Sequence, residues 1–168
     1  LEKTLRDRVA TVSSEIKNLA PPIPGKVFIP KRDNKRLGYK AGVPIQRYKE
    51  FNPGSRQQIE WVIRQHYGYS PSNADLYAED ERLKIDETTF HFIAKDKEAP
   101  EEVRVLAPLF EEQLMLTKRL GQLADGTQAW LKCVKGDEKI HGRVNPNGTV
   151  SGRATHSQPN VTQVPHAS

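Results

Sequence analysis

The sequence predicts a mostly α-helical protein with a small β region at its C-terminal end, which is an α+β class. Apolar residues recur at three- and four-residue steps in residues 1–19 and again in 106–123, the spacing of amphipathic helices. Beyond Gly126 this period is lost, and short strand-like runs lie between turn-forming residues. We therefore expect a helical region over 1–126 and a β-containing region over 127–168.

The first helix is predicted over residues 1–19. Its apolar stripe consists of Leu1, Leu5, Val9, Val12, Ile16 and Leu19. Pro21 and Pro22 should end it, because proline supplies no backbone donor and restricts the preceding residue. Residues 20–50 are rich in Pro, Gly, Lys and Arg and show little periodicity. We predict an extended loop there, with a short strand at 26–29.

The second helix should begin at Ser55. Gln58 follows three residues later, the spacing of a capping box in which the two side chains satisfy free backbone donors. Its predicted inner stripe is Ile59, Val62, Ile63 and His66. Gly68 is placed to end it.

Two further helices are predicted after a polar loop over 69–86. Asp86 can cap a short helix that runs to Ala94. Pro100 suits the first position of the longest helix, which should end at Asp125-Gly126. Pro108 lies inside this last pattern, so we expect a kink or a split there.

The β region is predicted to contain short strands and turns. Strands at 130–134 and 139–144 should flank a hairpin-like turn at 135–138. A second turn, Asn145-Pro146-Asn147-Gly148, precedes the segment with Arg153. The large aromatic residues are expected in the core rather than as base-stacking platforms: Trp61, Phe90, Phe92 and Trp130.

Charge is unevenly distributed along the 168 residues, whose net charge is +5. Eight bases between Lys26 and Lys49 meet only Asp33, whereas residues 75–102 are acidic. This asymmetry suits a protein that presents one face to phosphate, although a solvated surface would also explain it. One cysteine, Cys133, excludes an internal disulfide and a multi-thiolate metal site and fits an intracellular protein. No apolar run is long enough to cross a bilayer.

Three segments resemble family A, polymerase I-like, DNA polymerases. Ser151-Gly152-Arg153 followed by Pro159-Asn160-Val161-Thr162-Gln163-Val164-Pro165 resembles the strand that grips the primer in these enzymes. The block from 114 to 165 is similar to phage polymerases of the T7 type, and Phe51-Asn52-Pro53-Gly54-Ser55-Arg56 resembles the entry to the thumb helix. The resemblance implies long antiparallel thumb helices over 1–126 and the first strands of a polymerase palm over 127–168.

The same resemblance implies DNA-binding residues. Arg153, Asn160 and Gln163 would contact the primer terminus in the minor groove, where correct base pairs present acceptors in nearly the same places. Lys118 and Arg119 would hold duplex phosphates, with solvent-facing helix charges as the alternative. Four residues before Arg153 could line the same groove: His141, Arg143, Asn145 and Asn147. For the two asparagines, turn formation alone is a sufficient explanation.

The basic loop over 20–50 occupies the position of the thioredoxin-binding insertion of related phage polymerases. It is shorter than that insertion, so we expect its cations to contact DNA phosphates, with thioredoxin as the alternative partner. The proposed contacts are Lys31, Arg32, Lys35 and Arg36.

No catalytic or metal-binding residue is expected in this chain. Nucleotidyl transfer needs carboxylates that hold two metal ions. The resemblance implies that these aspartates belong to motifs that come after the Pro159–Pro165 segment, where this chain stops. No Asp or Glu follows Glu138, so His156 and His166 are expected to make polar contacts only. The chain looks cut at both ends, so we expect an inactive piece of a Mg²⁺-dependent polymerase.

The expected partners are primer–template DNA and the rest of the polymerase, namely the fingers and the remaining palm; the sequence leaves open whether an exonuclease domain belongs to it. The expected place of action is the cytoplasm of an infected host cell. The alternatives are a stand-alone or split-polymerase module that binds duplex DNA, and a domain that docks a processivity factor.

Overall fold

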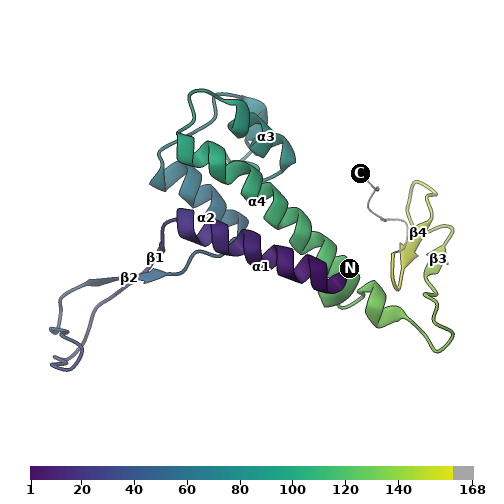
Figure 1. The fold of residues 1–168 in the computed structure, drawn as a ribbon, viewed down its shortest axis with the longest axis horizontal. Coiled ribbons are helices and arrows are strands. Elements are labelled where there is room, and N and C mark those ends of the chain that lie inside the picture. The colour runs from purple at the N-terminus through teal and green to yellow at the C-terminus, as the bar shows by residue number, and fades with distance from the viewer. Residues whose placement is uncertain (161–168) are drawn as a thin grey trace. The chain divides into compact units, whose positions relative to one another are not determined.

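The structure is a computed structural model that describes residues 1–160. Its contacts divide the chain into two compact units. The central unit is Ala10–Leu114, and the terminal unit combines Leu1–Val9 with the chain from Met115 onward (Figure 1). The α+β class predicted from the sequence is confirmed, since long helices precede small antiparallel sheets. The functional boundary expected at residue 126 stays a prediction. Gln163 and His166 lie outside the described residues.

Four α-helices form most of the fold: α1 (Glu2–Leu19), α2 (Arg56–Trp61), α3 (Glu87–Lys95) and α4 (Glu101–Leu120). In the central unit, Phe110 of α4 lies between two other phenylalanines, with ring centroids 5.9 Å from Phe51 and 6.1 Å from Phe90. The fully buried side chains around them include Val12, Ile16, Ile59, Ile63, Ile93 and Leu106. Burial of this apolar area supplies most of the stabilisation of the unit.

Capping distinguishes the starts of α2 and α3. The Asp86 carboxylate accepts a hydrogen bond from the Thr89 backbone N–H at 2.9 Å, which confirms the predicted cap of α3. The capping box predicted at Ser55 is wrong, because the Ser55 side chain makes no capping hydrogen bond. Gln58 Oε1 instead accepts from the Asn52 backbone N–H at 2.8 Å. Its amide therefore stabilises the turn before the helix.

The second helix changes its pitch after Trp61. A π-helical turn, Val62–His66, follows α2, and the Tyr67 N–H donates to the Val62 carbonyl across five residues. The wider turn changes the direction in which its own residues point, so His66, at its end, is exposed rather than part of the inner stripe. Gly68 ends the element at a φ of +65°, as predicted.

The longest helix is not split by its proline. α4 runs unbroken from Glu101 to Leu120 with Pro108 inside it, so of the two expected outcomes the split is wrong and the kink stays a prediction. Pro108 lies on the exposed side of α4, where water can replace the N–H that proline lacks. A π-helical turn, Gly121–Asp125, then ends at Gly126 as predicted.

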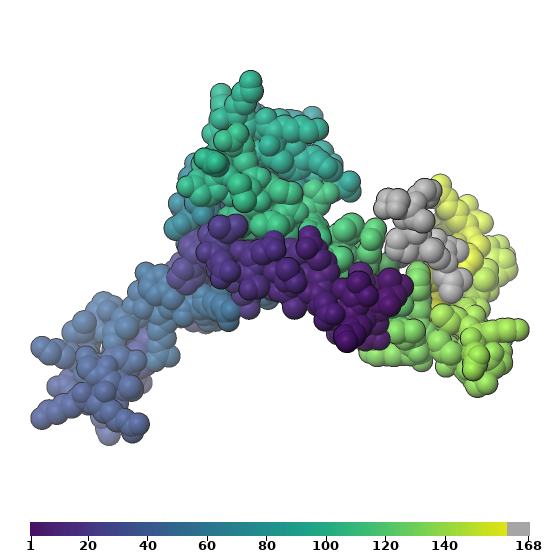
Figure 2. Space-filling view, viewed as in Figure 1, coloured from purple at the N-terminus to yellow at the C-terminus, as the bar shows by residue number. Residues whose placement is uncertain are grey.

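The short strand predicted at 26–29 belongs to a β-hairpin within residues 20–50, whereas the partner strand at 45–49 was predicted as loop. Strand β1 (Ile23–Phe28) pairs antiparallel with β2 (Ile45–Lys49), with an irregular register between Pro24 and Val27. The hairpin projects away from the helices of its own unit (Figures 1 and 2). Most of its residues are exposed on both faces, so the sequence lacks the polar–apolar alternation that reveals a half-buried strand.

The polar segment 69–86 is mostly loop, as predicted, with a short 3₁₀ turn at Ala74–Leu76. Among the aromatic residues expected in the core, Phe90 is fully buried, whereas Trp61, Phe92 and Trp130 are half-buried. Within residues 1–160, no helix has the length and apolar character that crossing a membrane requires.

The strands of the β region do not lie where they were predicted, since 130–134 is not a strand and only residues 143 and 144 of the segment 139–144 are in one. Trp130–Cys133 is a 3₁₀ turn, not a strand, because the Lys132 N–H donates to the Ala129 carbonyl and its Nζ donates to the carbonyls of Asp125 and Gly126. The turn at 135–138 is confirmed, closed by an isolated bridge between Val134 and Ile140. Strands β3 (Arg143–Asn145) and β4 (Thr155–Ser157) follow.

Candidate nucleic-acid interface

The β3–β4 hairpin brings several predicted DNA-binding residues together. Arg143 pairs with Ser157, Val144 with His156, and Asn145 with Thr155. Because side chains alternate along a strand, Arg143 and Asn145 lie on one face. Both are exposed.

A tight turn presents Arg153 to solvent. The Thr149 hydroxyl oxygen accepts a hydrogen bond from the Arg153 backbone N–H at 2.9 Å, and the Gly152 N–H donates to the Thr149 carbonyl at 3.0 Å. Gly152 has a φ of +73°, a conformation that glycine adopts without steric cost. The backbone around Arg153 is thus fixed, while its side chain is exposed and has no ion pair within residues 1–160.

Gly148 holds the start of this turn against β4. A Cβ atom added at Gly148 would lie 2.0 Å from Thr155 Oγ1, far inside van der Waals contact. The segment that carries Arg153 can therefore fold back on β4 only with glycine at this position. Gly148 was predicted as a turn residue, but neither its close approach to Thr155 nor the role of Thr149 was predicted from the sequence.

Two of the predicted groove residues already have intramolecular roles. Asn145 Oδ1 accepts a hydrogen bond from the Asn147 N–H at 3.2 Å, which supports the explanation by turn formation. His141 Nε2 lies 2.6 Å from Asp137 Oδ2, and this hydrogen bond, with one from the Lys139 N–H, lowers the pKa of the Asp137 carboxyl. His141 is therefore held at the 135–138 turn.

Lys118 and Arg119 lie in the last turn of α4. Lys118 is exposed and Arg119 is half-buried, and neither forms an ion pair among the described residues. Asn160, at the end of the described chain, is half-buried. These residues belong to the terminal unit, as the β3–β4 hairpin does.

The four loop cations form a basic tip on the β1–β2 hairpin of the central unit. Lys31, Arg32, Lys35 and Arg36 are all exposed, and none has an ion pair in the described part of the chain. The one acid nearby, Asp33, accepts a hydrogen bond from the Ala41 backbone N–H at 2.7 Å. Asp33 therefore closes the tip rather than neutralising a particular cation.

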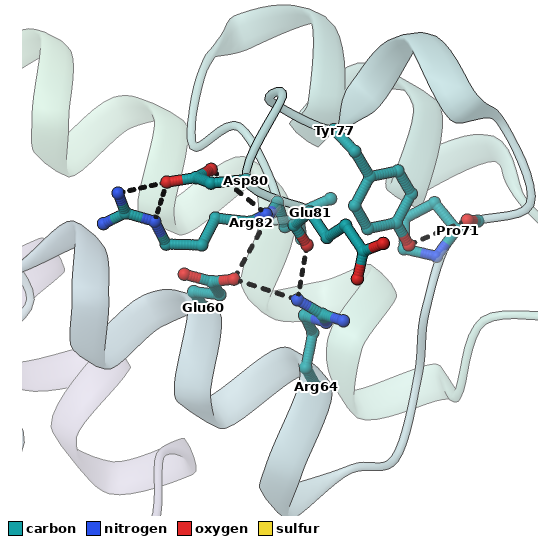
Figure 3. A network of polar contacts seen from close by, with 8 residues as sticks. Glu60, Arg64, Pro71, Tyr77, Asp80, Glu81 and Arg82 are labelled. Carbon is teal, nitrogen blue, oxygen red and sulfur yellow. Dashed lines mark hydrogen bonds and ion pairs between the residues drawn. The ribbon is translucent and has the colours of Figure 1, made fainter.

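The acidic stretch is partly neutralised within the central unit (Figure 3). Glu60 accepts hydrogen bonds from Arg64 at 3.2 Å and from the Leu83 N–H at 3.0 Å, and Arg64 also donates to the Glu81 carbonyl at 3.0 Å. Asp80 pairs with Arg82, whose hydrogen bonds lower the pKa of the Asp80 carboxyl. Of these residues, Glu60, Asp80, Arg82 and Leu83 line a hollow of about 230 Å³, which was not predicted from the sequence.

Carboxylates are few in the β region. Asp137 and Glu138 are its acidic residues, and no Asp or Glu follows Glu138 in the sequence. Asp137 is bonded to His141. Hard cations such as Mg²⁺ take carboxylate oxygens, and the expectation that this chain holds no metal stays a prediction.

An exposed basic hairpin tip and a fixed turn that presents an arginine are features of a nucleic-acid-binding protein. Most of the chain is similar in sequence to part of the phage DNA-directed DNA polymerases. The chain is 40% identical over 129 residues to the DNA-directed DNA polymerase of Escherichia phage T7 and, over the same length, to that of Enterobacteria phage T3. The resemblance to T7-type polymerases is thus confirmed.

The matched residues are 76% of this chain but only 17% of each phage polymerase, so the chain corresponds to a minor part of those enzymes. No protein-family profile matches the chain.

Proposed function

We propose that this chain holds the primer–template duplex beside the site of nucleotide addition in a T7-type DNA polymerase. On this proposal residues 1–126 form the thumb of a family A enzyme and 127–168 begin its palm. The similarity to the T7 and T3 enzymes supports the class. The role in gripping DNA is supported by the exposed cations described above.

The single observation that carries the proposal is the presentation of Arg153. Its backbone is fixed by Thr149, and its side chain has no intramolecular ion pair within residues 1–160. A guanidinium held in this way can donate to the minor-groove acceptors that correct base pairs share, and so test pair geometry without reading sequence. Asn160 and Gln163 would add donors next to it.

Phosphate contacts would supply most of the affinity. Lys118 and Arg119 on α4 would neutralise phosphates, and Arg143 on β3 would do so beside Arg153. Such contacts position a duplex without regard to sequence, as replication of any template requires.

The test is duplex binding by Arg153→Ala and Arg153→Lys variants. We expect the alanine variant to bind a primer–template duplex about tenfold more weakly, the scale of one charge-assisted hydrogen bond. The lysine variant should retain the positive charge but not the forked donor geometry of arginine. Its affinity for the duplex should therefore lie between those of the unmodified chain and of Arg153→Ala. Unchanged affinity in Arg153→Ala, or loss of its fold by circular dichroism, would contradict the proposed role.

Catalysis would depend on other segments of the polymerase. The magnesium ions would be held by carboxylates outside this chain, in the remaining palm, and the incoming nucleotide by the fingers. We expect no primer extension by residues 1–168 in magnesium buffer. Primer extension by the purified chain would contradict this proposal, because it would show that the side chains of residues 1–168 suffice for catalysis.

A second candidate function is the docking of a processivity factor. The β1–β2 hairpin exposes Val27, Ile29, Leu37 and Tyr48 by 55–65%, besides its basic tip. Exposed apolar side chains on one projecting element are typical of a protein-binding surface. Reduced thioredoxin is the partner to titrate first. Binding that is lost when residues 25–47 are replaced by a short turn would favour docking, whereas loss of DNA binding alone would favour phosphate contact.

A natural stand-alone or split module is the remaining alternative. An antibody to this segment should detect a product several times larger than 19.0 kDa in infected cells. A product near that mass would favour a separate duplex-binding chain.

A further inference from the structure

Glu87, His91 and Glu111 gather three metal-binding atoms between α3 and α4. Each residue offers one ligand atom, and the three atoms lie within 4.8 Å of one another. We propose that they form a binding site for a divalent transition metal, with Zn²⁺ as the ion that fits best. This site is independent of the proposed DNA contacts.

The backbone already positions these residues. Glu87 and His91 are four residues apart on α3, so their side chains share one face of the helix. Glu111 comes from α4. Directly beneath, Phe90 and Phe110 are fully buried and their rings lie 6.1 Å apart. Since Phe90 precedes His91 and Phe110 precedes Glu111, this core contact fixes the spacing of the two helices at the site.

The charges at the site are unbalanced. Two carboxylates approach each other, yet the Glu87 side chain has no ion pair or hydrogen bond within residues 1–160. Within the same range Glu111 pairs with His91, at 3.9 Å. Lys95, one helical turn beyond His91, forms no ion pair in the described chain. A dication would remove the repulsion between the carboxylates.

The donor set selects the ion. Zinc binds imidazole nitrogen and carboxylate oxygen at about 2.0–2.2 Å, so two ligand atoms of a tetrahedral site lie about 3.4 Å apart. The 3.9 Å between His91 Nε2 and Glu111 Oε2 approaches this, and both side chains can adjust, being 55% and 30% exposed. Magnesium and calcium take oxygen ligands, so an imidazole disfavours them. The fourth position would be taken by water.

The consequence would be a link between α3 and α4. A metal that binds only the folded chain raises the folding equilibrium constant about a hundredfold when its free concentration is a hundred times Kd. We expect ZnCl₂ to raise the thermal unfolding temperature of the chelator-treated 168-residue chain. We also expect Co²⁺ to bind at one site with the visible absorption of a tetrahedral complex.

The test compares variants of exposed residues. His91→Ala should abolish both responses without lowering the metal-free unfolding temperature, and Glu87→Gln should weaken them. His141→Ala is the matched control, since His141 is also exposed and lies beside a carboxylate, Asp137. Cys133→Ser controls for the thiol. A zinc response that persists in His91→Ala, or that is lost in either control instead, would overturn the proposal.

Discussion

The Tyr69 hydroxyl donates a hydrogen bond to Asp96 Oδ2 at 2.5 Å, which ties the end of the second helix to the end of α3. Tyr69 is buried, and burial, followed by this hydrogen bond, raises the pKa of its phenol above the ordinary value. The hydrogen bond from Tyr69 also lowers the pKa of the Asp96 carboxyl. The pair therefore links the stability of the central unit to pH at both extremes.

The first prediction concerns this pH dependence. Because the folded Tyr69 pKa lies above the unfolded value of about 10, its contribution to stability should be present below that value and lost as pH rises beyond it. The folded Asp96 pKa is lowered, so its contribution should be present above an unfolded pKa of about 3.9 and lost in stronger acid. Tyr69→Phe should cost about 1 kcal/mol at neutral pH and flatten the alkaline limb of the unfolding free energy. Tyr48→Phe, at a 65% exposed position, is the control and should leave that limb unchanged.

The second prediction separates two helix caps. Asp86→Ala should destabilise the chain by about 1 kcal/mol, since the Asp86 carboxylate accepts from the Thr89 N–H. Ser55→Ala should change stability little, because the Ser55 hydroxyl makes no capping bond. Urea unfolding of both variants measures the difference. Equal losses would show that the Ser55 side chain does cap α2.

The third prediction concerns the close approach of Gly148 to Thr155. Gly148→Ala should displace β4 and weaken duplex binding through Arg153, although residue 148 itself need not touch DNA. Gly136→Ala is the matched control, because a Cβ atom at Gly136 meets nothing within 4 Å. The double variant Gly148→Ala, Thr155→Ser should not regain duplex binding, because serine keeps the Cβ and hydroxyl that clash. The double variant Gly148→Ala, Thr155→Gly should regain part of the lost affinity, because glycine removes these atoms.

The fourth prediction concerns the basic tip. If each of its four cations neutralises one phosphate, replacing all four by alanine should flatten the slope of log binding constant against log salt by about 3.6. The charge-preserving exchange of Lys31 and Lys35 to Arg, and Arg32 and Arg36 to Lys, should keep the slope. If replacement of the four cations by alanine leaves the slope unchanged, the tip does not contact phosphates, and docking of a protein becomes the favoured role of the hairpin.

The helical elements were predictable because their signals are local. The stripe of α1, the Asp86 cap and the stop at Gly68 each depend on neighbours within a few residues. The errors arose where a side chain bonds to backbone more than one helical turn away. Gln58 bonds to Asn52 instead of capping α2, and Lys132 holds carbonyls that turn residues 130–133 into a 3₁₀ turn.

The candidate interface, too, could be predicted from the sequence only in part. Arg153 was singled out from residue order alone, but the hydroxyl of Thr149 that fixes its turn carries no sequence signal. Likewise, the pairing of Glu111 with His91 joins two helices whose packing no periodicity specifies.

The two ends of the hairpin between α1 and α2 lie next to each other, since Ile23 pairs with Lys49. A segment whose ends are joined by their own pairing can change in length without moving the helices on either side. The base of the β1–β2 hairpin is therefore a place where the chain tolerates insertions and deletions without rearrangement of the helical core.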